Sequence, residues 1–345
     1  MNVKSFGLAM MILASTIWAR TWIYHVGNSW TDQGLATHSI AQAFGDSTTA
    51  GIASIPGSSL SWTYDHPGGS IQVDPFTSYG KYTASTFLEA LPGNKWDFLI
   101  LQPWDRGVES DAQYGGYFAD SAYKGNPNTV TLIMACGPLI PDTALYSSKY
   151  DNGAVGENSH TRSYYEALVD TLKRRYPTKK FGIVPLGNMF SEIDKRILSG
   201  KGFPGVSRIS DLFLIPDGHY SSLGKYVEAV VQYTVIYQRN PKDAITSDLY
   251  FWQARYSVPR PFADSVWSLA WQIVQTNPYC RFTSQTGVSQ GSPAVHAVIR
   301  SAVREETMFS IDGRHVQPTR LNRGVCVSRN GVLVNAALRR GRTSK

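Results

Sequence analysis

Short runs of consecutive apolar residues alternate with longer amphipathic segments over the first 280 residues of the chain. The apolar runs have the length of buried strands and lie at 22–26, 51–56, 96–102, 130–136 and 180–185. Apolar residues at helical spacing predict helices at 33–44, 83–91, 160–176, 189–198, about 226–238 and 263–275. Strands that alternate with helices indicate an α/β fold, a three-layer α/β/α sandwich around a five-stranded parallel sheet.

Polar and small residues follow the first three of these strands. Ser29 stands in the turn after the first strand, Gly57 in the turn after the second, and Gln102 ends the third. In parallel sheets, ligands bind at the carboxyl edge of the strands. A serine between a strand and a helix lies where backbone N–H groups stabilise negative charge, which suits a nucleophile. The same arrangement also occurs in purely structural loops, so Ser29 alone leaves both interpretations open.

A second polar group, Asp217-Gly218-His219, lies in a short loop directly before the predicted helix that ends at about 238. Histidine is the usual base for a serine nucleophile, and a carboxylate fixes its tautomer. The alternative is a helix-capping loop in which Asp217 binds backbone N–H groups. Only one residue separates Asp217 from His219, so Asp211 and Asp32 are kept as weak substitutes for the acid.

Aromatic residues are frequent in the stretch 61–80, which the sequence predicts to be a long loop. Trp62 and Tyr64 are candidates to line a sugar-sized pocket, together with Trp104 after the third strand. The alternative is that these rings pack the loop onto the body of the protein. Gly45-Asp46-Ser47-Thr48 is predicted to be a turn that ends a helix, because no extended apolar strand precedes it.

The net charge of +7 is concentrated near the carboxyl terminus. Residues 282–345 contain ten Lys and Arg against three acids, and residues 1–281 contain 23 of each. The neutral body disfavours a nucleic-acid or polyanion site, and the arginines of the tail lack the interleaved aromatics of a stacking surface. No periodic segment follows Pro278, and we expect a flexible basic tail over 282–345 after a domain at 20–281.

Lys4 precedes an apolar run at 6–19 that has the length of a signal-peptide core. We therefore expect a signal peptide at 1–19 and export to the periplasm, the cell envelope or the medium; a single membrane anchor and an apolar first helix are the alternatives. Three scattered cysteines make neither a disulfide framework nor a zinc site, and no cluster of metal ligands is visible.

The order of these elements resembles the SGNH, or GDSL-like, hydrolase superfamily. Gly27-Asn28-Ser29-Trp30-Thr31 resembles its first block, with asparagine in place of the common aspartate. Pro56-Gly57-Ser58-Ser59-Leu60 resembles the second, and Asp217-Gly218-His219 the last, with one residue instead of two between acid and base. The third block departs further, because Gln102 stands where the family commonly has a Gly-x-Asn-Asp turn.

The resemblance implies a flavodoxin-like fold and a serine esterase that needs no metal or organic cofactor. Ser29 would attack an ester carbonyl, His219 would accept its proton, and Asp217 would orient His219. The N–H groups of Ser29 and Gly57, with the Gln102 amide, would form the oxyanion hole. We expect O-acetyl esters of small molecules or polysaccharides as substrates and no nucleic-acid partner; the oligomeric state is not predicted. The alternative is an inactive carbohydrate-binding or envelope protein with the same fold.

Overall fold

A computed structural model describes most of the chain. The described residues are 20–33, 36–68, 80–81, 86–104, 106–138, 146–156, 160–215, 218–244 and 258–282, with short segments at 308–310, 315–316, 326–328 and 333–334. The chain divides into two compact units, Met1–Val288 and Ser289–Lys345. The expected signal peptide at 1–19 lies outside the described residues.

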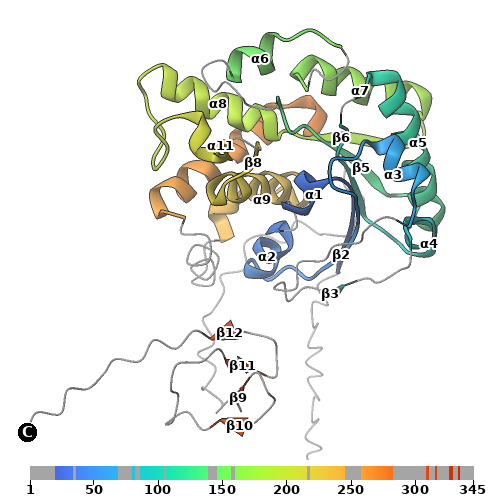
Figure 1. Cartoon of the computed structure of the whole chain (residues 1–345), viewed down its shortest axis with the longest axis horizontal. Helices are drawn as coiled ribbons and strands as arrows, with labels where there is room; N and C mark the ends of the chain where they lie inside the picture. The colour runs from blue at the N-terminus through green and yellow to red at the C-terminus, as the bar shows by residue number, and fades with distance from the viewer. Residues whose placement is uncertain are drawn as a thin grey trace, which may run out of the picture. The chain divides into compact units, whose positions relative to one another are not determined.

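A six-stranded parallel sheet forms the centre of the first unit (Figure 1). Its strands are β1 Thr21–Gly27, β2 Thr48–Ser54, β3 Gly80–Lys81, β4 Phe98–Leu101, β5 Val130–Met134 and β6 Lys180–Val184. They follow the order β3-β2-β1-β4-β5-β6. The five predicted strands are confirmed, and the two-residue strand β3 extends the sheet by one edge strand that was not predicted.

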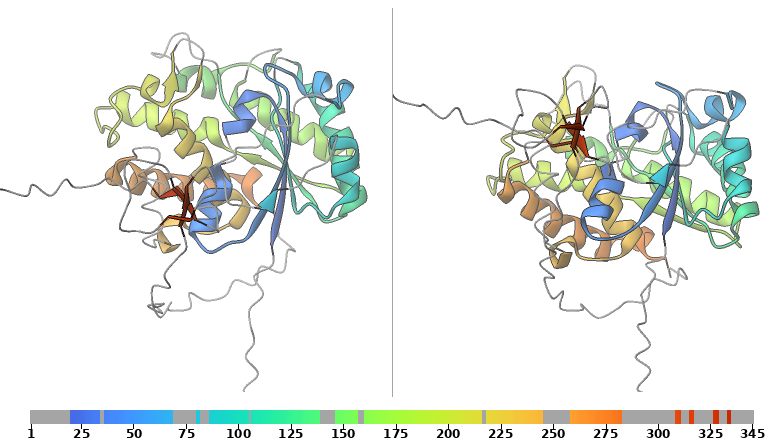
Figure 2. Two further views of the ribbon diagram at one scale, coloured as in Figure 1. Left: turned by 60° about the horizontal axis from the view of Figure 1, so that its bottom comes forward. Right: turned by 90° about the horizontal axis from the view of Figure 1, so that it is seen from below.

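Helices cover both faces of the sheet. They are α1 Ser29–Gln33, α2 Ala36–Ala43, α3 Leu60–Asp65, α4 Phe87–Gly93, α5 Val108–Gly125, α6 Tyr146–Asn152, α7 Arg162–Arg175, α8 Leu186–Leu198, α9 Ser222–Tyr237 and α11 Arg260–Thr276. On one face, α5 packs against α3, α4 and α7; on the other, α9 packs against α2, α8 and α11 (Figures 1 and 2). The three-layer α/β/α fold is confirmed, and every predicted helix overlaps an observed one.

The order in which the chain adds strands to the sheet reverses between β1 and β4. From β1 the chain passes through α2 to β2 on one side, whereas from β4 it passes through α5 to β5 on the other. The helices α2 and α5 lie on opposite faces of the sheet (Figure 1). In open α/β sheets, ligands bind outside the carboxyl ends of the strands at such a switch point. Ser29 and Gln102 follow these strand ends.

Among the helices of the described residues α5 is the longest, and it was not predicted. Its interior contains Gly115 and Gly116, which a helix disfavours by about 1 kcal/mol each relative to alanine. The structure explains the second of them: a Cβ atom on Gly116 would come within 2.1 Å of the Tyr176 hydroxyl. Glycine at this point lets α5 approach Tyr176 closely. Tertiary packing thus overrides a propensity that argues against a helix.

The stretch predicted as a loop at 61–80 begins with a helix, so this part of the prediction is wrong. Ser59 caps α3, and its side chain accepts a hydrogen bond from the Trp62 N–H. The helix has six residues, too few for a periodic pattern to be recognised. At the earlier Gly45-Asp46-Ser47-Thr48 stretch the predicted turn is confirmed, because α2 ends at Ala43 and β2 begins at Thr48.

The second unit contains a four-stranded antiparallel sheet in the order β10-β9-β11-β12. Its strands are β9 Met308–Ser310, β10 His315–Val316, β11 Cys326–Ser328 and β12 Leu333–Val334. The sequence analysis found no periodic segment after Pro278 and did not predict these short strands. Strands of two or three residues are shorter than the window in which alternation can be recognised.

Candidate active site

The turn that carries Ser29 is capped by its own sequence. Asn28 follows β1, and its Oδ1 accepts a hydrogen bond of 3.0 Å from the N–H of Trp30 in the first turn of α1. The Thr31 N–H binds the Asn28 carbonyl at 2.9 Å. These are the bonds of a helix N-cap, which asparagine makes well. Ser29 is consequently the first residue of α1 and stands half-buried at the strand end, as predicted.

The side chain of Gln102 is hydrogen-bonded to the Ser29 turn. Its Oε1 accepts hydrogen bonds from the Asn28 N–H at 3.0 Å and the Thr31 hydroxyl at 3.3 Å, and its Nε2 donates to the Pro103 carbonyl at 2.9 Å. The side chain is fully buried. These contacts differ from the predicted role, in which the Gln102 amide faces the substrate oxyanion. Gln102 has a longer side chain than asparagine, and that length lets it reach under the turn.

Gly27 allows this close packing. A Cβ atom at this position would lie 2.0 Å from Thr31 Oγ1 and 2.8 Å from Gln102 Cβ. No side chain larger than hydrogen fits between these groups without displacing one of them. The glycine in the turn before Ser29 is thus required by the contact between β1 and Gln102, the residue that follows β4.

The turn after β2 is joined to the Ser29 turn by hydrogen bonds. Asn28 Nδ2 donates to the Ser58 carbonyl at 3.1 Å, and the Ser58 hydroxyl binds the Gly27 carbonyl at 3.4 Å. An aspartate at position 28 has no N–H to donate to this carbonyl, which explains the asparagine at this place. Since neither Asn28 nor Ser58 is exposed to water, the link is a buried one.

Gly57 occupies the third position of a β-turn. The Ser58 N–H binds the Ile55 carbonyl at 3.0 Å, Pro56 is the second residue, and Gly57 has a φ of +69°. Proline followed by a glycine with positive φ is the pattern of a type II turn. The turn's own hydrogen bond uses the N–H of Ser58 and not that of Gly57. Gly57 is exposed, so its predicted role as an oxyanion donor is compatible with its position.

His219 lies on a short antiparallel ribbon. β7 Phe213–Leu214 pairs with β8 His219–Tyr220, in the register Leu214↔His219. Gly218 has a φ of +76°, and its N–H binds the Leu214 carbonyl at 2.9 Å. The ribbon brings His219 Nε2 to 2.8 Å from Ser29 Oγ, across 190 residues of sequence. The two residues predicted as nucleophile and base are in direct contact.

Aromatic packing holds this contact in place. Tyr220, next to His219, is buried, and its ring lies 5.3 Å from that of Trp30, next to Ser29. Tyr220 also contacts Phe190 of α8 and Phe213 of β7. Each catalytic candidate is therefore followed by a buried ring, and the two rings contact each other. This pairing sets the approach of the ribbon to the Ser29 turn.

The acid of the predicted triad, Asp217, lies outside the described residues and stays a prediction. Of the two substitutes, Asp211 has other partners: its carboxylate accepts hydrogen bonds from Ser207 N, Ser207 Oγ, Arg208 N and Arg208 Nε. Partial burial acts to raise the pKa of Asp211, but these bonds outweigh it and hold the pKa below its ordinary value. Nothing is described of the side chain of Asp32.

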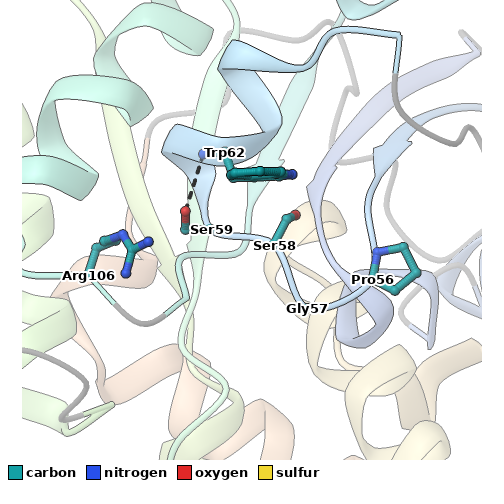
Figure 3. A pocket seen from close by; sticks show the side chains of 6 residues that line it. All are labelled: Pro56, Gly57, Ser58, Ser59, Trp62 and Arg106. Carbon is teal, nitrogen blue, oxygen red and sulfur yellow. Dashed lines mark hydrogen bonds between the residues drawn. The ribbon is translucent and has the colours of Figure 1, made fainter.

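The three aromatic residues predicted to bind substrate have different places. Trp62 lines an open pocket of about 320 Å³ beside Gly57, together with Pro56, Ser58, Ser59 and Arg106 (Figure 3). Tyr64 instead packs among Phe87, Tyr114, Tyr117 and Phe118, between α3, α4 and α5. Trp104 is half-buried and supports Trp30 at 4.9 Å. Only Trp62 of the three lines this pocket.

Neither a metal site nor a membrane span is found in the described part of the chain. Its His, Cys, Asp and Glu side chains form no group of three or more suited to bind a metal ion. None of its helices combines the length and the apolar character that crossing a bilayer requires.

Comparisons with known proteins identify the fold. The chain is similar to a DUF4886 family protein from Bacteroides uniformis, with a TM-score of 0.51 and 15% identity, over 78% of this chain and 99% of the other. The chain shares the α/β/α fold of that protein. It also matches a chain provisionally described as an SGNH hydrolase from Slackia heliotrinireducens (TM-score 0.38, 14% identity, 62% and 98% covered). A third match, provisionally described as a GDSL-like lipase from Parabacteroides merdae, has a TM-score of 0.38 and 11% identity over 62% and 94% of the two chains.

No protein-family model matches the chain, and no curated protein matches it in sequence. The matched structures are less than 25% identical to this chain, and the likeness to the first of them shows the fold alone. Its chemistry must therefore be argued from the residues of the site.

Several residues that shape the site were missed by the sequence analysis. Asn28 and Ser58 stand inside the two recognised blocks, so their polar side chains were a signal that was available. Tyr220 and Trp30 could not be paired from sequence, because 190 positions separate them. Arg106 carries no sequence signal at all; only the fold places it in the pocket with Gly57.

Proposed function

We propose that this protein is a serine hydrolase that cleaves ester bonds, with Ser29 as the nucleophile and His219 as the base. The observation that supports this most strongly is the 2.8 Å contact between Ser29 Oγ and His219 Nε2 at the switch point of the sheet. A non-catalytic binding protein has no reason to keep these two groups in contact. The SGNH-like fold supports the same class of reaction.

The reaction would proceed through an acyl-enzyme. With its proton on Nδ1, His219 accepts the Ser29 hydroxyl proton at Nε2 while Oγ attacks the ester carbonyl. The backbone N–H groups of Ser29 and Gly57 stabilise the resulting oxyanion. His219 then passes the proton to the leaving alcohol, and a water molecule activated by the same imidazole releases the acid. Asp217 is the proposed orienting acid for His219.

Gln102 takes a different part in this proposal from the one predicted. Its buried contacts with Asn28 and Thr31 suit a residue that positions the nucleophile turn. We therefore assign the oxyanion hole to backbone donors and treat Gln102 as a positioning residue.

The proposed substrates are acyl esters, O-acetyl groups on carbohydrates in particular. An exposed tryptophan next to the oxyanion turn supports a carbohydrate, because the C–H face of a sugar ring packs on an indole. We also propose that the protein acts outside the cytoplasm, after removal of a signal peptide at 1–19; the apolar run at 6–19 supports this.

The test is hydrolysis of p-nitrophenyl acetate by the wild-type protein and by Ser29→Ala, both shown to be folded by circular dichroism. Loss of the serine should lower kcat by about 10³-fold or more. Ser268→Ala, at an exposed serine of α11, serves as the control and should retain turnover. Equal rates for wild type and Ser29→Ala, on this ester and on an acetylated polysaccharide, would show that the fold serves binding without catalysis.

A further inference from the structure

The pocket beside Gly57 has a chemical character that the ester chemistry does not require. Its six lining residues come from the turn after β2, from α3 and from the segment before α5 (Figure 3). It adjoins the Ser29 turn, since Ser58 in its wall accepts the hydrogen bond from Asn28. A group bound there would therefore belong to the same molecule as the ester that Ser29 attacks.

One wall of the pocket is an exposed, immobilised indole. Trp62 is 53% exposed, although large apolar side chains are normally covered. Its ring stacks on His66 at 3.9 Å with an angle of 18° between the planes. The backbone of Trp62 is held by the Ser59 cap of α3 at 3.2 Å. A ring fixed in this way offers its remaining surface to a flat apolar partner, such as the C–H face of a sugar, at little entropic cost.

The other wall carries a positive charge. Arg106 is exposed, and it is the only charged residue among the six that line the pocket. Figure 3 shows the guanidinium of Arg106 and the indole of Trp62 on either side of Ser59. A guanidinium binds a carboxylate through two parallel hydrogen bonds, a geometry that lysine does not reproduce. Arginine opposite tryptophan thus suits a ligand with both an apolar ring face and an anionic group.

We propose that this pocket binds a sugar unit that carries a carboxylate, adjacent to the acylated position of the substrate. This proposal rests on the proposed function and narrows its substrate class to esters of acidic glycans. Residues 1–281 carry 23 basic and 23 acidic residues, so general attraction of polyanions does not account for such a preference. The preference is local, and single substitutions of the pocket test it.

The experiment measures binding without turnover, by isothermal titration calorimetry on the Ser29→Ala protein. The two ligands are trigalacturonate and its fully methyl-esterified form, which differ only in the charged groups. The acidic form should bind about tenfold more tightly. Arg106→Ala should abolish this difference, and Arg106→Lys should retain part of it. Trp62→Ala should lower the affinity for both ligands by a similar factor, and Trp62→Phe should lower it less.

Arg174→Ala is the matched control. Arg174 is an exposed arginine near the end of α7. From there the chain leads to the start of β6, so Arg174 lies toward the amino ends of the strands, whereas the pocket lies at their carboxyl ends. It should leave both affinities unchanged. Equal affinities for the two ligands in the Arg106-containing protein would overturn the proposal, as would the absence of any binding. Sodium acetate that displaces the acidic sugar at equal concentration would also overturn it, because the pocket would then bind an anion alone.

The result of this binding experiment and the result of the esterase test can be told apart. If Ser29→Ala keeps wild-type esterase activity while acidic-sugar binding still depends on Arg106, the proposed reaction fails and the pocket stands. If the esterase depends on Ser29 and the two sugars bind equally, the reaction stands and the pocket assignment fails.

Discussion

The Ser29 turn and the His219 ribbon position the proposed nucleophile and the proposed base by different physical means. The Ser29 turn follows β1, a central strand that is hydrogen-bonded to a neighbouring strand on each side. The Gln102 side chain and the Ser58 carbonyl accept hydrogen bonds from this turn. The His219 ribbon has two residues in each strand and stands outside the main sheet. It is located by the ring of Tyr220 against those of Trp30 and Phe190.

This difference separates two kinds of constraint. Hydrogen bonds to neighbouring strands orient Ser29, the proposed nucleophile, whereas apolar packing sets the distance of His219, the proposed base. Changes at the Ser29 turn should consequently disturb stability and activity together, because the turn is part of the sheet's core. Changes at the ribbon should affect activity more than stability.

The largest expected effect comes from removing the base itself. His219→Gln should lower kcat for p-nitrophenyl acetate by about 10³-fold or more, because no group then accepts the Ser29 proton. Its melting temperature should stay near that of the wild type, since His219 is half-buried at the end of a ribbon. His315→Gln, in the second unit, is the control. A variant that keeps its turnover would remove His219 from the mechanism.

The strand that carries the Ser29 turn should be sensitive to acid. His25 of β1 and His38 of α2 are fully buried with their Nε2 atoms 3.2 Å apart. Burial lowers the pKa of His25 to about 3; burial and the neighbouring His25 lower that of His38. As the pH falls, the unfolded chain binds protons at these two histidines before the folded protein does. The contribution of the neutral histidines to stability is therefore complete above the ordinary pKa of histidine, and it is lost as the pH falls toward the lower pKa of the folded state. Between about pH 7 and about pH 4, His25 alone should cost about 3 kcal/mol of unfolding free energy.

Urea titrations across this range measure the effect. Burial raises the pKa of Asp46 and Asp97, and these groups act in the opposite direction. The informative quantity is therefore the difference between the wild type and a variant with both His25→Leu and His38→Leu. The variant should lose less stability on acidification, and equal slopes would contradict the prediction.

At the Ser29 turn, Gly27→Ala should destabilise the protein by about 2 to 4 kcal/mol and lower its activity. The added methyl group meets Thr31 and Gln102, neither of which can move without losing a buried hydrogen bond. Gly93→Ala is the matched control, because nothing lies within 4 Å of a Cβ atom there. Chemical denaturation compares the two; equal stabilities would show that the turn adapts to the methyl group.

The smallest effect concerns the ring pair that joins the two regions. A double-mutant cycle of Trp30→Leu and Tyr220→Leu should give a coupling of about 0.5 to 1.5 kcal/mol in stability, with a further coupling in kcat. Phe203 and Phe262, whose rings lie 5.6 Å apart, form the control pair. They should couple in stability alone. Absence of coupling in kcat for Trp30 and Tyr220 would mean that their contact does not position His219.

The sequence was sufficient for the framework of the fold and failed where small residues or short elements are involved. Strands such as Phe98–Leu101 are continuous apolar runs, and hydrophobicity alone identifies them. The helix α5 was missed because Gly115 and Gly116 weaken its pattern, and the reason for Gly116 is Tyr176, 60 positions away. The strands β9 to β12 were missed because they are too short to show alternation.

The sequence by itself determined the α/β class, the place of Ser29 at a strand end and the pairing of Ser29 with His219 as candidates. These depend on apolar periodicity and on the order of short motifs, which are local properties of the chain. The tertiary structure alone decided that Gln102 supports the nucleophile turn, that Tyr64 packs away from the pocket beside Gly57, and that Arg106 faces Trp62 across Ser59. Such roles depend on which distant side chains become neighbours, and burial and backbone geometry select those neighbours only when the chain has folded.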